Sequence, residues 1–301
     1  MSTWKPDICI YHGNCDDGFA AAWAIWKRWP NVEFHPGFYG KPLPDVAGKN
    51  VLFVDFSAKR PVIDALAQVA KSIVILDHHK TAEADLEPFK MTMCGTAVLS
   101  ADDIGHVFRD FYELDRPPIV AWFEMEQSGA ALAWQFANGV NRQDVAMPEM
   151  LYLIEDRDLW RFAFGERTRL FSAALRTYPM EFDVWNSIES LVESVVHEGE
   201  VVLRAHRANI KKILGEHYVT DIQGHTVPVV NAPYHYASDA AHDLLSMYPD
   251  APFAASWFRR ADGKVQWSLR SEDHRVDVSE VAKSQGGGGH HCRPERRVVF
   301  R

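Results

Sequence analysis

The sequence lacks the features that would place the protein in a membrane or an oxidising compartment. No apolar run approaches the roughly 18 to 20 residues that a membrane-spanning helix requires. Only four cysteines occur among 301 residues, and none forms a Cys-x-x-Cys pair, which is typical of reduced thiols rather than of a disulfide framework. No signal peptide is recognisable at the start, so we expect a cytoplasmic protein without a membrane partner.

The sequence also lacks an excess of basic residues. Its 32 Lys and Arg face 41 Asp and Glu, which gives a formal net charge of -9. Proteins that coat long nucleic acid depend on many phosphate contacts, so this balance argues against long duplex DNA as a partner. It leaves room for a small anionic substrate that is held by a metal cluster.

Short apolar segments alternate with helical ones in the first part of the chain. We predict strands over residues 7–11, 32–34, 50–53 and 72–76, and helices over residues 19–28 and 61–70. Another helix is predicted to start at Ser128, a good capping residue. Strands that alternate with helices indicate an α/β fold with a mostly parallel sheet covered by helices.

A long charged segment, residues 185–216, has helical periodicity and is predicted to connect two domains. Beyond it we predict strands over 218–222 and 226–231, helices over 238–247 and 276–283, and a hairpin of residues 253–258 and 265–270. Because the chain is long for one core, we divide it into a catalytic domain (1–185), a connecting helix (186–216) and a smaller α/β domain (217–301).

Residues of the types that commonly bind metals follow the predicted strands. They are His12, Asp16 and Asp17 after the first strand, Asp55 after the third, Asp77, His78 and His79 after the fourth, and later Asp156 or Asp158. A parallel sheet gathers such strand ends at one edge. Histidines and carboxylates without paired cysteines suit Mn²⁺, Mg²⁺ or Fe²⁺, and Zn²⁺ less distinctively.

More ligands are present than one ion needs, so we predict two ions that share a carboxylate, an arrangement used in phosphoryl displacement. A single one of these residues would more often be a hydrogen-bonded histidine or a helix cap. For the whole set at strand ends, a metal site is the better interpretation.

Five segments of the sequence resemble motifs of the DHH phosphoesterase superfamily. Asp77-His78-His79 after an apolar strand resembles its signature. The stretches that resemble its other motifs, in the family's order, are 12–22, 54–57, 155–160 and, for the glycine-rich element of the DHHA1 domain, 286–290. The resemblance spans nearly the whole chain and implies a two-domain hydrolase with a two-ion centre, usually of Mn²⁺.

The resemblance also implies a role for each matching residue. The metal ligands would be His12, Asp17, Asp55, His78 and Asp156, with Asp158 as the alternative to Asp156. Asp55 would bridge the ions and His79 would face the scissile phosphate. Cys15 stands where many members have a second aspartate, so Asp16 is included as a ligand that could replace it. The residues after His290 also depart from the family pattern.

Two features of the second half are candidates for holding a phosphate. A glycine-rich turn lets backbone N–H groups approach phosphate oxygens, although glycine runs are more often linkers. Arginine suits bidentate anion contacts, although an exposed arginine on the surface is an equal alternative here. The predicted substrate-binding residues are Arg270, Gly287, Gly288, Gly289 and His290.

The leading functional hypothesis is a metal-dependent phosphoesterase for short oligonucleotides, dinucleotides or nucleoside bisphosphates, with exonuclease-like action included. A second hypothesis is pyrophosphatase-like hydrolysis of a phosphoanhydride at the same metal edge. A third is a catalytically weakened sensor that binds a nucleotide, because Cys15 and the C-terminal residues depart from the family pattern. A homodimer is left open by the sequence.

Overall fold

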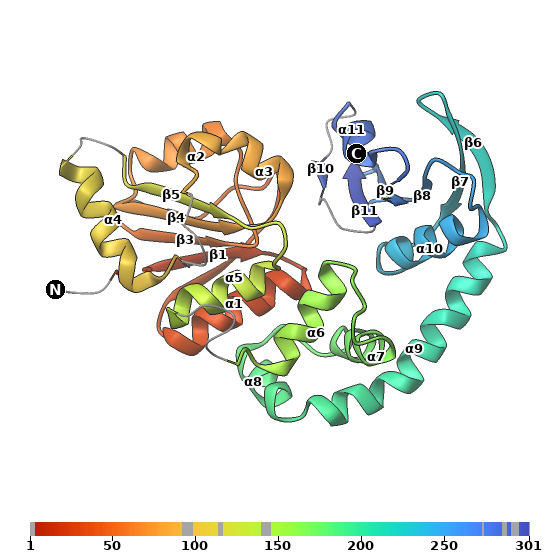
Figure 1. Cartoon of the computed structure of the whole chain (residues 1–301), viewed down its shortest axis with the longest axis horizontal. Coiled ribbons are helices and arrows are strands. Elements are labelled where there is room, and N and C mark those ends of the chain that lie inside the picture. The colour runs from red at the N-terminus through yellow and green to blue at the C-terminus, as the bar shows by residue number, and fades with distance from the viewer. Residues whose placement is uncertain are drawn as a thin grey trace. The chain divides into compact units, whose positions relative to one another are not determined.

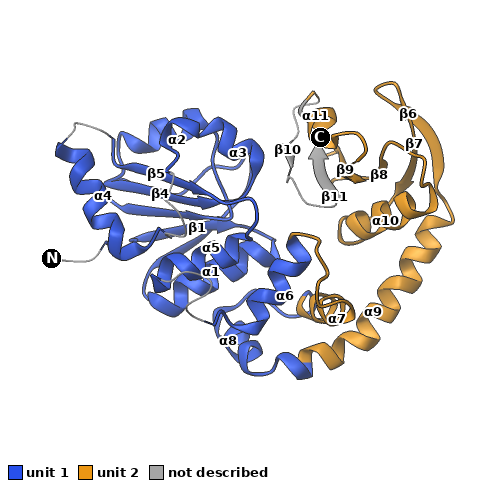
Figure 2. Ribbon diagram, viewed as in Figure 1, with its two compact units in different colours: residues 1–158, 176–194 blue, residues 159–175, 195–301 orange. Residues whose placement is uncertain are grey.

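The computed structural model describes residues 4–91, 99–113, 117–139, 146–272, 274–284, 288–289 and 295–300 (Figure 1). It divides into two compact units (Figure 2). The first consists of residues 1–158 and 176–194, and the second of residues 159–175 and 195–301. Each unit contains a sheet with helices, as expected for an α/β protein. The predicted domain boundaries at 185 and 216 stay a prediction.

The first unit is built on a five-stranded, all-parallel sheet in the order β2-β1-β3-β4-β5. The strands are β1 (Ile8–His12), β2 (Glu33–Gly37), β3 (Asn50–Val54), β4 (Ser72–Asp77) and β5 (Ile119–Phe123). The predicted mostly parallel sheet is therefore confirmed. The strands β3, β4 and β5 are buried almost throughout, which explains why their sequences are nearly continuous apolar runs.

Helices cover both faces of this sheet (Figure 1). The helices of this unit are α1 (Asp16–Arg28), α2 (Arg60–Ala67), α3 (Lys80–Asp85), α4 (Ala101–Glu113), α5 (Gly129–Asn138), α6 (Glu149–Asp158) and α8 (Phe182–Ser190), with a short 3₁₀ turn at Glu87–Phe89. Of these, α6 packs against α1 and α5, and α8 packs against α1 and α6. The predicted cap at Ser128 is confirmed, since its hydroxyl accepts a hydrogen bond from the Ala131 N–H at 3.3 Å.

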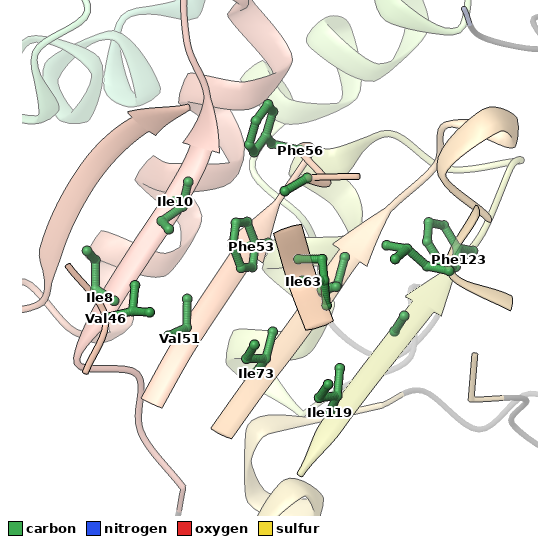
Figure 3. Close-up of a cluster of buried hydrophobic side chains, with 14 residues drawn as sticks. Ile8, Ile10, Val46, Val51, Phe53, Phe56, Ile63, Ile73, Ile119 and Phe123 are labelled. Atoms are coloured by element: carbon green, nitrogen blue, oxygen red, sulfur yellow. The ribbon is translucent and has the colours of Figure 1, made fainter. Parts of the chain in front are cut away.

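The core on one face of the sheet follows the two-residue period of the strands. Ile8 and Ile10 of β1 point to the same side as Val51 and Phe53 of β3, and Ile63 of α2 packs over them (Figure 3). All of these side chains are fully buried. Burial of this kind contributes about 1.5–3 kcal/mol for each large apolar side chain, and it keeps the strand ends in a fixed order.

The second unit contains a six-stranded sheet in the order β10-β11-β9-β8-β7-β6. Its elements are α7 (Glu166–Leu175), most of α9 (Val192–Leu214), β6 (Tyr218–Ile222), β7 (His225–Asn231), α10 (Tyr234–Met247), β8 (Ala254–Arg259), β9 (Val265–Glu272), α11 (Val278–Lys283), β10 (Gly288–Gly289) and β11 (Glu295–Phe300). Among the described strands of this sheet, only β7 and β8 pair in parallel. The predicted hairpin is confirmed as β8 and β9.

Each face of the second sheet has its own apolar core. Val229 of β7 belongs to the cluster that contains Val278 of α11. The next residue, Val230, belongs to the cluster that contains Leu244 of α10 and Ile210 of α9. Alternate residues of one strand therefore belong to two cores, so this second sheet is covered by helices on both faces.

The predicted continuous helix over residues 185–216 is wrong at one position. The structure ends α8 at Ser190 and starts α9 at Val192, because Leu191 leaves the helical conformation and its N–H bonds the Ile188 carbonyl at 2.9 Å. No glycine or proline marks this break in the sequence. No helix in the described ranges is long and apolar enough to cross a bilayer.

Candidate metal centre

The register of the parallel strands brings the predicted ligands to one edge of the first sheet. Tyr11 of β1 pairs with Val54 of β3, and Val54 pairs with Leu76 of β4. The residues that follow these three are His12, Asp55 and Asp77. Three strands that are distant in sequence therefore end side by side in polar residues, as expected for this sheet edge.

One group of possible metal ligands consists of His12, Asp55 and His79. Ligand atoms of the three residues all lie within 4.8 Å of one another. His12 Nδ1 lies 3.4 Å from Asp55 Oδ2. Asp55 and His79 are buried, whereas His12 is partly exposed. The group offers two imidazoles and a carboxylate.

A second group consists of Asp17, Asp55 and His78, again with ligand atoms within 4.8 Å of one another. His78 Nε2 lies 3.0 Å from Asp55 Oδ1 and 3.7 Å from Asp17 Oδ2. It also lies 3.6 Å from Asp158 Oδ2 at the end of α6. Asp55 belongs to both groups, so one carboxylate could bridge two ions.

Asp55 is held in an unusual backbone conformation. Its φ is +53°, in the left-handed region that aspartate tolerates better than most residues, and its N–H donates to the Leu76 carbonyl at 3.0 Å. The side chain is 1% exposed, and among the described residues Oδ2 accepts no hydrogen bond of ordinary geometry. A buried carboxylate oxygen in this state is costly, and a cation would satisfy it.

Asp17 connects the centre to α5. Its Oδ2 accepts a hydrogen bond from the Gly129 N–H at 2.6 Å, and its Oδ1 accepts one from the Ala130 N–H at 3.1 Å. Burial and then the nearby charges of Asp55 and Asp158 raise the pKa of Asp17 well above its usual range. The carboxylates repel one another here, which favours a divalent cation among them.

His78 carries the compensating charge of the cluster when no cation is bound. Burial alone would lower its pKa, but the hydrogen bond to Asp55 and the charges of Asp158, Asp55 and Asp17 raise the pKa of His78 to about 10. For Asp55, burial is outweighed by the interactions with the imidazoles of His12 and His78, which hold the pKa of that carboxyl well below its usual range. A metal ion would take over from the His78 proton.

Asp77 fixes the two histidines through hydrogen bonds. Its Oδ1 accepts hydrogen bonds from His79 Nδ1 at 2.5 Å and from the His78 backbone N–H at 2.7 Å, and Ser57 Oγ donates to its Oδ2. Burial opposes ionisation, but His79 lowers the pKa of Asp77 overall. Because Nδ1 bonds Asp77, Nε2 is the nitrogen through which His79 could contact a metal ion or a substrate.

The structure separates two pairs of predicted ligands. Asp17 faces the centre, while Asp16 pairs with Arg176, with Asp16 Oδ2 3.2 Å from the Arg176 Nε. Asp158, the alternative at the end of α6, lies beside His78. Asp156 is buried two residues earlier, which is about 200° away around the helix. Which of the two aspartates binds a metal stays a prediction.

The predicted substrate-binding residues belong to the second unit. Arg270 is a buried residue of β9, and Gly288 and Gly289 form β10. Gly287 and His290 lie outside the described residues. The role of all five in substrate binding stays a prediction.

Several groups that shape the centre are not evident from the sequence. Ser57, two residues after Asp55, donates a hydrogen bond to Asp77. The Gly129 and Ala130 N–H groups are far from Asp17 in sequence, and only the small residue after the cap at Ser128 hinted at close packing. Cys15 is also affected by these carboxylates: burial, and then the charges of Asp55, Asp158 and Asp17, raise the pKa of its thiol.

Comparison with sequence collections gives one relative of unknown function. No family model matches the chain. The chain is 26% identical over 310 residues to Uncharacterized protein R106 of Acanthamoeba polyphaga mimivirus, an alignment that covers 95% of this chain and 66% of that protein. The chain therefore spans just under two thirds of the length of the curated relative that it matches.

Comparison with solved structures gives distant likenesses. The pGpG-specific phosphodiesterase PggH from Vibrio cholerae is 11% identical with a TM-score of 0.46, and 97% of this chain and 92% of that chain are covered. RecJ from Thermus thermophilus, in complex with Mn²⁺, is 13% identical with a TM-score of 0.45, and the match covers 98% of this chain and 49% of RecJ. A DHH domain described as belonging to a family of ribosomal proteins is 14% identical with a TM-score of 0.49, and the match covers 97% of this chain and 82% of that chain.

Proposed function

We propose that this chain is a DHH-type, metal-dependent phosphoesterase that hydrolyses phosphodiester or phosphomonoester bonds of small nucleotide substrates. The observation that carries the proposal is the position of Asp55. Its two oxygens face imidazoles of two different ligand groups, His12 at 3.4 Å and His78 at 3.0 Å. A buried carboxylate placed in this way fits a centre of two ions.

The donor set supports divalent ions that accept carboxylates and imidazoles together, and we propose Mn²⁺, with Mg²⁺ as an alternative. His12 and Asp55 would hold one ion, with His79 facing the phosphate beside it, and Asp17, Asp55, His78 and Asp158 would hold the other. Ions bound there would lower the pKa of a water molecule and stabilise negative charge on the phosphate.

The protein's own groups would orient the reaction. Asp77 fixes the His79 ring through Nδ1, and Ser57 fixes Asp77 in turn. His79 is thereby held in one orientation, in which its Nε2 can donate to a phosphate oxygen as charge develops there. Loss of either supporting group would leave the ligands in place and the ring misdirected.

We propose that the second unit supplies the grip on the substrate. Arg270 and the glycine-rich element, Gly287 to His290, would contact phosphate groups through the guanidinium and the backbone N–H groups. The net charge of -9 supports a short oligonucleotide, a dinucleotide or a nucleoside bisphosphate rather than long duplex DNA.

A substrate panel tests the proposal. The purified chain would be assayed with Mn²⁺ on di- to pentanucleotides, cyclic dinucleotides, nucleoside bisphosphates and pyrophosphate. We expect Mn²⁺-stimulated hydrolysis of at least one nucleotide, two ions per chain, and loss of activity in Asp55→Asn. The matched control is Asp64→Asn on the surface of α2, where the side chain is 49% exposed.

Two other outcomes would redirect the proposal. Hydrolysis of pyrophosphate alone would favour a phosphoanhydride hydrolase at the same centre. Nucleotide binding without turnover, with no Mn²⁺ bound at micromolar concentration, would favour a nucleotide sensor. This alternative is specific because Cys15 replaces an aspartate in the stretch that resembles the first motif. If Asp55→Asn hydrolyses nucleotides as fast as Asp64→Asn does, the two-ion centre described above is not the site of the reaction.

A further inference from the structure

A buried arginine in the second unit lies over the ring of a tryptophan. Arg270 of β9 is 1% exposed, and its guanidinium carbon is 3.9 Å from the ring centroid of Trp160. Trp160 is itself 6% exposed. A guanidinium at this distance from an aromatic face gains a cation–π attraction that increases when water is excluded, as it is here.

The tryptophan is in turn fixed by its neighbours. The ring of His242 on α10 meets Trp160 edge-on at a centroid distance of 5.6 Å, and the ring of Phe162 does so at 5.2 Å. Arg169 of α7 lies 3.7 Å from the Phe162 ring. Two arginines thus flank two aromatic side chains in edge-on contact, and Trp160 has neighbours on several sides that hold its ring plane in place.

The backbone of this segment is shaped to present the ring. Trp160 has a φ of +55° and Phe162 a φ of +49°, both in the left-handed region that bulky residues avoid. The following helix is anchored, since a Cβ on Gly199 of α9 would lie 2.1 Å from the Leu170 carbonyl oxygen of α7. Unfavourable conformations persist where the surroundings determine them, and they gather at functional sites.

We propose that Trp160 is a positioning residue that holds the Arg270 guanidinium in one orientation for a phosphate group of the substrate. The inference deepens the proposed function and rests on it. An indole carries no charge, so it can orient a guanidinium without neutralising it, whereas a carboxylate in its place would compete with the phosphate. An aromatic ring contacts the face of a guanidinium, while anions bind the N–H groups at its edge, so the two contacts are compatible.

The same short segment also contributes to the first unit. Asp158, which lies beside His78, precedes Trp160 by two residues in the chain. A ligand candidate and the residue that orients Arg270 are therefore joined by a single intervening residue, Leu159. A substitution at Trp160 must consequently be checked for its effect on metal binding as well as on the substrate.

The test compares Trp160→Leu, Trp160→Phe and, as the matched control, Phe164→Leu, which removes a ring that is 51% exposed from the same segment. The probe is the 5′-phosphorylated dinucleotide pApA with Mn²⁺. In Trp160→Leu we expect KM to rise about 3- to 30-fold while kcat stays within about twofold. Trp160→Phe keeps a ring face and should stay within about threefold of the wild-type KM.

A double-substitution cycle separates positioning from an independent role. Arg270→Lys removes the planar fork, so Trp160→Leu should add no further rise in KM when it is combined with Arg270→Lys. Mn²⁺ binding should be unchanged in every variant. If Trp160→Leu does not fold, Trp160→Met keeps the bulk without a ring face. A KM equal to that of Phe164→Leu, or additive effects in the double variant, would overturn the inference.

The affinity for pApA, measured by calorimetry with Ca²⁺ in place of Mn²⁺, gives a second readout that does not need turnover. Weaker binding in Trp160→Leu than in Phe164→Leu supports the positioning role even if pApA is not hydrolysed. If the wild-type chain binds pApA but does not cleave it with Mn²⁺, the proposed hydrolysis of this substrate fails. If Asp55→Asn abolishes cleavage while Arg270→Lys changes neither KM nor affinity, the proposed reaction stands and the inference about Trp160 fails.

Discussion

A Cβ placed on Gly129 would lie 2.4 Å from the Cβ of Asp55, closer than real Cβ atoms approach one another. The same Cβ would lie 3.0 Å from Asp17 Oδ2. Glycine at the first position of α5 therefore allows this helix to touch two ligand candidates at once. The close approach also lets the Gly129 N–H reach Asp17.

Gly129→Ala is expected to damage both folding and metal binding. The added methyl group must displace Asp55 or the start of α5, and overpacking of this kind costs about 1–3 kcal/mol. Denaturant unfolding without Mn²⁺ would measure the loss in the free energy of unfolding. Unfolding with Mn²⁺ would show that the ion stabilises Gly129→Ala less than it stabilises the wild type. The control is Gly105→Ala in α4, where the nearest atom would be 3.9 Å away. There alanine should stabilise by about 0.5–1 kcal/mol. Equal effects at both positions would contradict the packing argument.

Substitution of the two aspartates of α6 should distinguish the ligand from its neighbour. Asp158 Oδ2 is 3.6 Å from His78 Nε2, so we expect Asp158→Asn to weaken Mn²⁺ binding about tenfold or more, because one negative ligand is lost. Asp156→Asn should weaken it less. Calorimetric titration of the metal-free protein with Mn²⁺ measures both constants. A larger loss in Asp156→Asn would identify Asp156 as the ligand.

The stability of the metal-free protein should fall on the alkaline side. The folded pKa of His78 is raised to about 10, above the value of about 6.5 for an unfolded histidine. A raised histidine pKa contributes stability that is fully present below about pH 6.5 and is lost as pH rises through about 10. Between these values the free energy of unfolding should therefore decrease, by up to about 1.4 kcal/mol per pH unit from this group.

Urea unfolding in the presence of a chelator at several pH values would measure this slope. His78→Gln should have a smaller alkaline slope than the wild type, because the contribution of the His78 proton is lost. Saturating Mn²⁺ should also reduce the slope of the wild type, because the ion replaces that proton. In acid the sign is reversed for Asp77, whose lowered pKa contributes stability above about pH 4 that is lost as pH falls further. Identical alkaline slopes in wild type and His78→Gln would show that the proton is not held as described.

Cys15→Asp should make the protein more dependent on metal. The Cys15 thiol already senses the charges of Asp55, Asp158 and Asp17, so a further carboxylate would add repulsion when no ion is bound. We expect a lower Tm without metal and a larger rise in Tm on addition of Mn²⁺ than in wild type. Cys15→Ser, which adds no charge, is the control. A rise in Tm with Mn²⁺ no larger than that of Cys15→Ser would show that residue 15 is too far from the ions to matter.

The strand ends were predictable because parallel pairing has few solutions. Apolar runs that end in His12, Asp55 and Asp77 can meet only at one edge of a covered sheet, and the structure places them there. The choice between Asp16 and Asp17 was harder. Adjacent residues in the first turn of a helix point about 100° apart, and the sequence does not reveal which of them faces the sheet edge.

Contacts between distant segments lay beyond the sequence. The hydrogen bond from Gly129 to Asp17 joins residues that are 112 positions apart. The contact of Arg270 with Trp160 depends on a segment that leaves the first unit directly after α6. The break at Leu191 has no glycine or proline to announce it, so tertiary packing decides where α8 ends.

The path of the chain between the units also determines which fragments of the protein could be expressed separately. It crosses from the first unit to the second after residue 158, returns after residue 175 and crosses again after residue 194. A gene truncated after any one of these positions would encode an incomplete first unit or would carry residues of the second. Expression of the metal centre as an independent fragment would therefore require removal of residues 159–175 and a designed linker, rather than a single stop codon.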